Sequence, residues 1–78
     1  MLMRINLDSI EKCRDLCNLC NRYKELKIDV CHSRYLVDAR SFLGLLTLVF
    51  HDVSLFIRPE EDIDDFINEL IKLGGYKS

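Results

Sequence analysis

The chain has 78 residues, of which 49% are hydrophobic, and its eleven basic and thirteen acidic residues give a net charge of −2. This length and composition predict one folded domain, residues 1–78, with a small core. The basic residues form no stripe, which argues against nucleic acid or a membrane surface as the main partner. With no signal-peptide pattern and no apolar stretch long enough to span a membrane, we expect a cytoplasmic protein with reduced cysteines.

The first part of the chain predicts a strand followed by a helix. Residues 3–7 alternate apolar and polar side chains, which is the period of a half-buried strand. Asp8 then offers a helix N-cap, with Glu11 three residues later as in a capping box. Apolar residues at helical spacing predict an amphipathic helix over 9–22, namely Ile10, Cys13, Leu16, Cys17, Leu19, Cys20 and Tyr23.

The middle of the chain predicts three strands and one short helix. Residues 26–31 and 35–39 alternate again, and the polar break CHSR between them favours a hairpin. The apolar run after Ser41 predicts a short helix with that serine as its N-cap. Residues 53–57 form the last alternating segment.

The C-terminal part predicts a second long helix. Pro59 suits the first helical position, and the acidic residues 60–62 suit a helix N-terminus. Gly74 and Gly75 end the pattern. The order β-α-β-β-α-β-α predicts an α+β fold, an open-faced two-layer sandwich with helices on one face of an antiparallel sheet.

The stretch DARSFLGLLTL resembles a known family. It is similar to a stretch reading much like KSIMGVMSL in HPr, the histidine-containing phosphocarrier of the bacterial sugar phosphotransferase system. The matching residues here are Arg40, Ser41, Phe42, Leu43, Gly44, Leu45, Leu46, Thr47 and Leu48. The resemblance implies an HPr-like fold with a four-stranded antiparallel sheet, a non-enzymatic role, and two phosphorylation sites.

The first site implied by the family is a histidine that opens the first helix in a HARPA-like motif. The matching segment here is LDSIEK, in which Asp8 or Ser9 takes the place of the histidine. Because Asp8 and Glu11 would repel a phosphate, we expect no phosphohistidine transfer. Some relatives of HPr lack this histidine and serve regulation.

The second implied site is a serine that caps the short middle helix and is phosphorylated by HPr kinase in many Gram-positive members. Ser41 matches this position, with Arg40 as a neighbouring cation. The family also binds its partners through the apolar residues of this helix, here Phe42, Leu43, Leu45 and Leu46. The implied partners are phosphotransferase-system components, HPr kinase or a transcription regulator. The family's glycine after this helix is replaced by Val49.

Other interpretations of these features stay open. Ser41 is also explained as a plain N-cap that never carries a phosphate, which is the leading alternative. The domain is then an interaction or assembly module without phosphoryl chemistry, for example a weak homodimer through the leucines. Exposed apolar residues usually mark some interaction surface.

The cysteines and histidines suggest a third class, a thiol or zinc protein. Cys17 and Cys20 form a C-x-x-C, but with Cys13 they lie on the apolar face of the first helix, where cysteine packs as a small hydrophobe. Cys31 falls on the outward side of its strand, and His32 and His51 on loops. We therefore expect no metal site and no cofactor.

Overall fold

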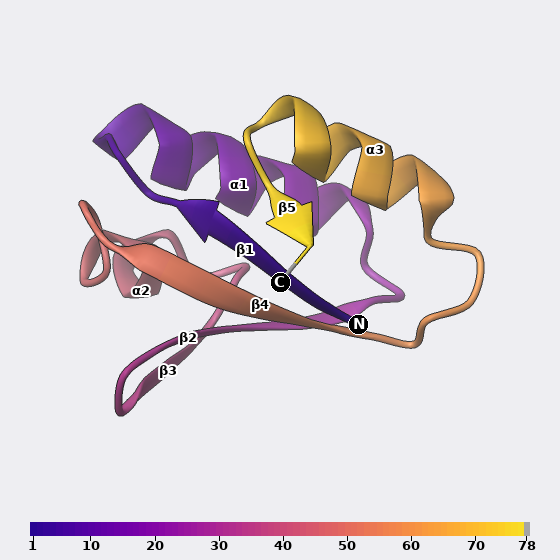
Figure 1. Ribbon diagram of the computed structural model, residues 1–78, viewed down its shortest axis with the longest axis horizontal. Helices are drawn as coiled ribbons and strands as arrows, with labels where there is room; N and C mark the ends of the chain where they lie inside the picture. The colour runs from indigo at the N-terminus through magenta and orange to yellow at the C-terminus, as the bar shows by residue number, and fades with distance from the viewer. Residues whose placement is uncertain (78) are drawn as a thin grey trace.

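The computed structural model describes residues 1–77 as a five-stranded antiparallel sheet with three helices (Figure 1). The elements are β1 (Leu2–Asn6), α1 (Ile10–Arg22), β2 (Lys27–His32), β3 (Tyr35–Asp38), α2 (Phe42–Leu46), β4 (Asp52–Arg58), α3 (Asp64–Lys72) and β5 (Tyr76–Lys77). The strand order is β3-β2-β4-β1-β5. The predicted α+β sandwich is confirmed, but the sheet has five strands rather than four. None of the helices in this part of the chain is long and apolar enough to cross a membrane.

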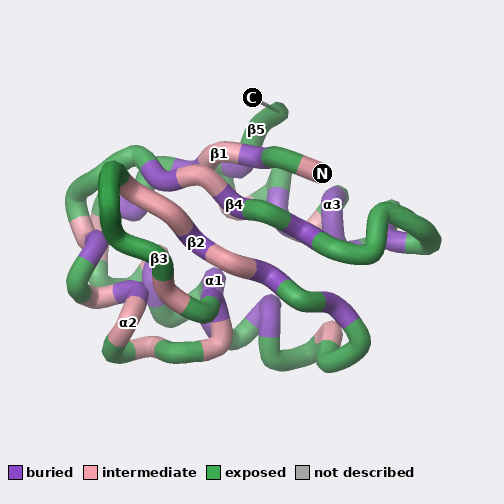
Figure 2. The backbone as a smooth tube through the Cα atoms, turned by 90° about the horizontal axis from the view of Figure 1, so that it is seen from below, coloured by how far each residue is buried: buried purple, intermediate pink, exposed green. Residues whose placement is uncertain are grey.

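The core lies between the inner face of the sheet and the helices, with α1 and α3 side by side above β1 (Figure 1). Burial alternates along β1, β2 and β4, as the colours of β4 show in Figure 2, so one set of side chains from each of these strands faces the core. Met3 lies opposite Leu55, and Ile5 opposite Val53, and all four are fully buried. Each such side chain contributes about 1.5–3 kcal/mol on leaving water.

Helix α1 is capped by Ser9, not by Asp8 as the sequence predicted. The backbone of Ser9 is extended, and its hydroxyl accepts a hydrogen bond from the Lys12 N–H at 3.0 Å. Asp8 lies one residue earlier and forms an ion pair with Lys12, with 3.8 Å between Oδ1 and Nζ. Two adjacent residues can each act as a cap, and pattern alone does not separate them.

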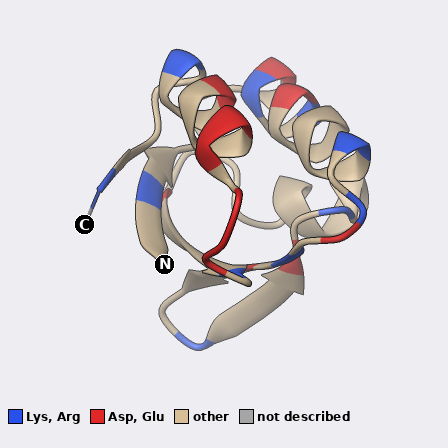
Figure 3. Ribbon diagram, turned by 90° about the vertical axis from the view of Figure 1, so that its right-hand side faces the viewer, with Lys and Arg blue, Asp and Glu red and all other residues tan. Residues whose placement is uncertain are grey.

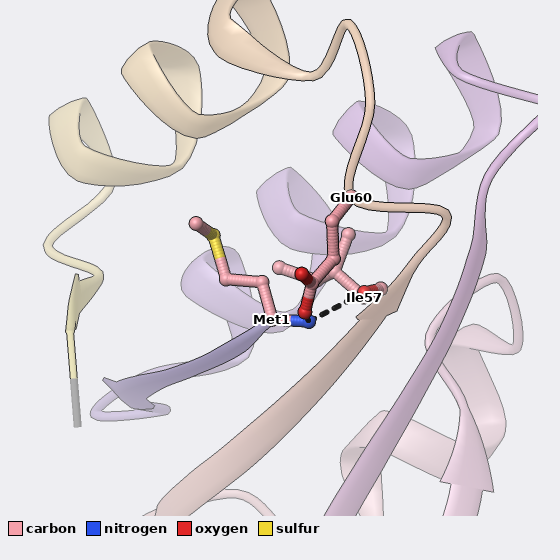
Figure 4. Close-up of polar contacts among 3 residues, drawn as sticks. All are labelled: Met1, Ile57 and Glu60. Atoms are coloured by element: carbon pink, nitrogen blue, oxygen red, sulfur yellow. Dashed lines mark hydrogen bonds and ion pairs between the residues drawn. The ribbon is translucent and has the colours of Figure 1, made fainter.

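Helix α3 begins at Asp64, five residues after the predicted start at Pro59. Pro59 directly follows β4, and the acidic segment after it crosses from the sheet to the helix layer before α3 forms (Figure 3). The Met1 ammonium donates hydrogen bonds to the Ile57 carbonyl, at 2.9 Å, and to the Glu60 carboxylate (Figure 4). This contact lowers the pKa of the Glu60 carboxyl.

The end of α3 leads into the strand that the sequence did not predict. Gly74 has φ +104°, a left-handed conformation that favours glycine, so the predicted end of the helix is confirmed. At Gly75 an added Cβ would lie 2.8 Å from the Leu70 Cγ, so the chain passes close over its own helix. Tyr76 then pairs with Arg4 of β1.

Candidate protein-binding site

Ser41 is the N-cap of α2, as the sequence predicted. Its backbone is extended, and its hydroxyl accepts a hydrogen bond from the Gly44 N–H at 3.1 Å. Its carbonyl accepts the first helical bond, from the Leu45 N–H. The residue is exposed, so the hydroxyl is accessible as well as engaged.

Gly44 is required by close approach rather than by backbone angle. A Cβ at this position would lie 3.2 Å from the Ser41 Oγ and 3.2 Å from the Val37 Cβ. Helix α2 therefore lies tightly against β3, and a Cβ at this position would require its neighbours to shift by a few tenths of an ångström. The glycine within the apolar run thus fixes where Ser41 sits.

Arg40 is not directed at Ser41. Its guanidinium donates hydrogen bonds to the Tyr23 carbonyl, at 2.7 Å, and to the Leu26 carbonyl. Both acceptors lie in the turn between α1 and β2, so Arg40 fastens that turn to the segment entering α2. Its Nη2 group is therefore engaged with this turn, and the role of Arg40 beside a phosphate on Ser41 stays a prediction.

The four apolar residues predicted as one exposed patch divide into three classes. Leu43 is 77% exposed, whereas Leu45 is fully buried in the core. Phe42 and Leu46 are half-buried and pack against the core. Because α2 turns by about 100° per residue, positions 42, 43, 45 and 46 cannot all share one face. Leu45 is therefore a core residue, and its place in the predicted patch was wrong.

Two exposed apolar residues beside α2 were missed by the sequence reasoning. Phe50 is 69% exposed, and its φ of 71° is uncommon for a residue other than glycine. Its N–H donates to the Leu7 carbonyl, which ties the loop after α2 to the end of β1. Ile10, in the first turn of α1, is 53% exposed.

Helix α1 packs against helix α2, and we infer that these residues lie along that junction. The Cys13 thiol donates to the Leu45 carbonyl, and the Arg14 guanidinium lies 5.7 Å from the Phe42 ring centroid. Ile10 lies on the same side of α1, three and four residues before these contacts. We name the surface formed by Ile10, Phe42, Leu43, Leu46 and Phe50 the α2 patch.

The start of α1 carries acidic side chains. Ser9 uses its hydroxyl to cap the helix, and Asp8 places a carboxylate beside it. The Lys12 ammonium there also donates to the Leu73 carbonyl at 2.8 Å. The Asp8 carboxylate already interacts with the positive end of the helix dipole. A second anion, such as a phosphate, is therefore less favourable at this helix start.

The two histidines lie together at one end of the sheet. The rings of His32 and His51 are stacked, with centroids 4.4 Å apart and planes at 25°. His32 is the last residue of β2, and its Nδ1 donates to the Asp52 carbonyl at 3.0 Å. His51 precedes β4 and was correctly placed in a loop, whereas His32 belongs to a strand.

Three of the four cysteines are buried on α1, as predicted. Cys13, Cys17 and Cys20 all face the core, while Cys31 is partly exposed on the outer face of β2. Burial raises the pKa of the Cys13 and Cys17 thiols and raises that of Cys20 to about 12. Protonated thiols bind metals poorly, which favours packing as their role. Residues 1–77 contain no cluster of three or more metal-ligating side chains.

Comparison with known proteins finds no family model, no curated protein and no solved structure that matches this chain.

Proposed function

We propose that this protein is an HPr-like regulatory protein that binds protein partners through the α2 patch. The observation that carries the proposal is the exposure of Leu43, Phe50 and Ile10 around a helix capped by an accessible serine. A folded domain gains nothing in stability from exposing a leucine and a phenylalanine at a junction it has otherwise packed closely. Such a patch is typical of a protein interface, in which a few aromatic and aliphatic side chains provide most of the affinity.

Ser41 is proposed as the control point of this surface. A phosphate there adds a charge of about −1.5 to −2 directly beside Phe42 and Leu43. It would change the affinity of any partner that covers the patch, by repulsion from acidic groups or attraction to basic ones. The Asp38 carboxylate already accepts the Arg40 N–H at 2.9 Å, so the added charge enters a segment with an acidic group.

Transfer of a phosphoryl group through a histidine is not part of the proposal. The acidic start of α1 opposes a phosphate there, and Ser9 is committed to capping. Incubation with the first enzyme of the phosphotransferase system and phosphoenolpyruvate is expected to give no phosphohistidine. Labelled His32 or His51 would contradict this part of the proposal.

The modification itself is tested with an HPr kinase and labelled ATP. We expect label on the wild-type protein and none on Ser41→Ala, with Thr47 left unmodified. Thr47 is a suitable internal control, because its hydroxyl lies on the same helix and donates to the Gly44 carbonyl at 2.6 Å. Absence of label on the wild type would remove the phosphoserine half of the proposal.

An interaction module without phosphoryl chemistry is the second candidate, and the 77% exposure of Leu43 favours it equally. In that case the patch is covered by a constant partner or by a weak homodimer. Sedimentation of wild-type protein and Leu43→Lys separates the two candidates. A self-association that Leu43→Lys abolishes supports the module, whereas a Ser41-specific phosphorylation supports the regulatory protein.

A further inference from the structure

Strand β3 lies at one edge of the sheet, and its outer edge is not paired with another strand in the described part of the chain. It pairs with β2 alone among the strands of residues 1–77, and Figure 2 shows it at the opposite edge from β5. The Ala39 N–H donates to the Ile28 carbonyl at 3.1 Å. Since bonded and non-bonded pairs alternate in an antiparallel ladder, the N–H and carbonyl of Leu36 point away from β2. One residue at this edge thus offers a donor and an acceptor.

The side chains on this edge are unusually apolar for an unpaired strand. Tyr35 and Leu36 are each 65% exposed. Edge strands are normally blunted by lysine, proline or a bulge, which prevents pairing with another chain. Within β3 the only charged residue is Asp38. The strand therefore lacks the common protection against pairing and carries an apolar surface that pairing would cover.

We propose that two copies of this chain pair antiparallel through β3, with the two-fold axis at Leu36. In this register the Leu36 N–H of each copy donates to the Leu36 carbonyl of the other, and the two leucine side chains meet. Arg34, in the turn directly before β3, then comes beside Asp38 of the other copy. Both residues are exposed, and neither forms an ion pair within residues 1–77. The two five-stranded sheets then form one continuous sheet.

Charge selects this register over its neighbour. With the axis at Val37, Arg34 would come beside position 40 instead, where the Arg40 guanidinium is bound to the Tyr23 and Leu26 carbonyls, and the opposite-charge pairs with Asp38 would be lost. With the axis at Leu36, two opposite-charge pairs flank the centre, and such pairs stabilise cross-strand contacts. The same complementarity favours a second copy over an unrelated extended peptide, because Arg34 and Asp38 match each other.

The dimer is tested first by sedimentation of the full chain over rising concentration. Pairing through an edge of four residues buries less surface than the about 1,200 Å² or more of a standard interface. We therefore expect a reversible dimer with a Kd of up to about 1 mM. Leu36→Pro removes an N–H that the fold does not use and should abolish the dimer. Leu43→Lys should leave it unchanged, which separates this edge from the α2 patch. A strict monomer at about 1 mM, or a dimer unaffected by Leu36→Pro, overturns the proposal.

The register is tested by reversing charges in two separate chains. Arg34→Asp and Asp38→Arg should each weaken self-association about tenfold, because like charges then face each other twice. An equimolar mixture of the two variants should recover dimerisation as a heterodimer, in which both pairs are again opposite. Failure of the mixture to recover overturns the register, and unchanged melting of Arg34→Asp verifies that the fold is intact.

Discussion

Removal of the Leu45 side chain tests how α2 is seated. Leu45 is fully buried, so Leu45→Ala removes three carbons from the core, worth about 2.4 kcal/mol at about 0.8 kcal/mol per methylene. The cavity left behind adds to this, and the total falls within about 2–5 kcal/mol. A domain of this length has about 4–12 kcal/mol of stability, so the loss is a large fraction of the whole.

The matched control is Leu43→Ala, two residues away on the same helix. Leu43 is 77% exposed, so the same chemical change should alter the free energy of unfolding by no more than about 0.5 kcal/mol. Urea unfolding of both variants, at unchanged m-value, measures the difference. Equal losses from the two substitutions, or a loss of less than about 1 kcal/mol for Leu45→Ala, would refute the division between core and surface.

Three further predictions concern Ser41 as an N-cap, Arg40 as a hydrogen-bond donor and Cys20 as a buried thiol. Ser41→Ala should lower the free energy of unfolding by about 1 kcal/mol, while Ser41→Asp, which keeps a capping oxygen, should change it by a few tenths in thermal melts. Arg40→Met should cost about 1.5–3 kcal/mol in the same measurement, because its charged group serves two carbonyls. Burial raises the pKa of Cys20 from 9.0 to about 12, so its contribution to stability is complete below pH 9 and is lost as the pH rises towards 12. Urea titrations from pH 8 to pH 11 should therefore show a shallower decline for Cys20→Ala than for the wild type, and identical declines would contradict this assignment.

The strands and α1 were predictable because their patterns extend over several residues. Alternation placed four strands correctly, and helical spacing placed the three thiols of α1 on its buried face. The errors concern positions set by single contacts. Ser9, rather than the predicted Asp8, is the N-cap of α1. Helix α3 begins five residues after Pro59, where the chain has turned back over the core.

The candidate site was predicted only in part, for similar reasons. A five-residue helix is too short for a hydrophobic period to show which side faces the core, so Leu45 was wrongly grouped with Leu43. Phe50 belongs to the α2 patch only because the loop after α2 is hydrogen-bonded to the Leu7 carbonyl. Strand β5 has two residues and no alternation at all, and its position follows from the glycine turn at Gly74.

The central claim, that partners dock on the α2 patch and are controlled at Ser41, is tested most directly by phosphorylation kinetics with HPr kinase. Leu43→Lys leaves the phosphate acceptor in place but sets a charge in the patch, so we expect kcat/KM to fall about tenfold or more, as for loss of an interface anchor. Ile71→Lys on α3 is the matched control, since Ile71 is 51% exposed and lies outside the patch, and its kcat/KM should equal that of the wild type. Equal values for all three proteins, or no phosphorylation of any, would contradict the claim.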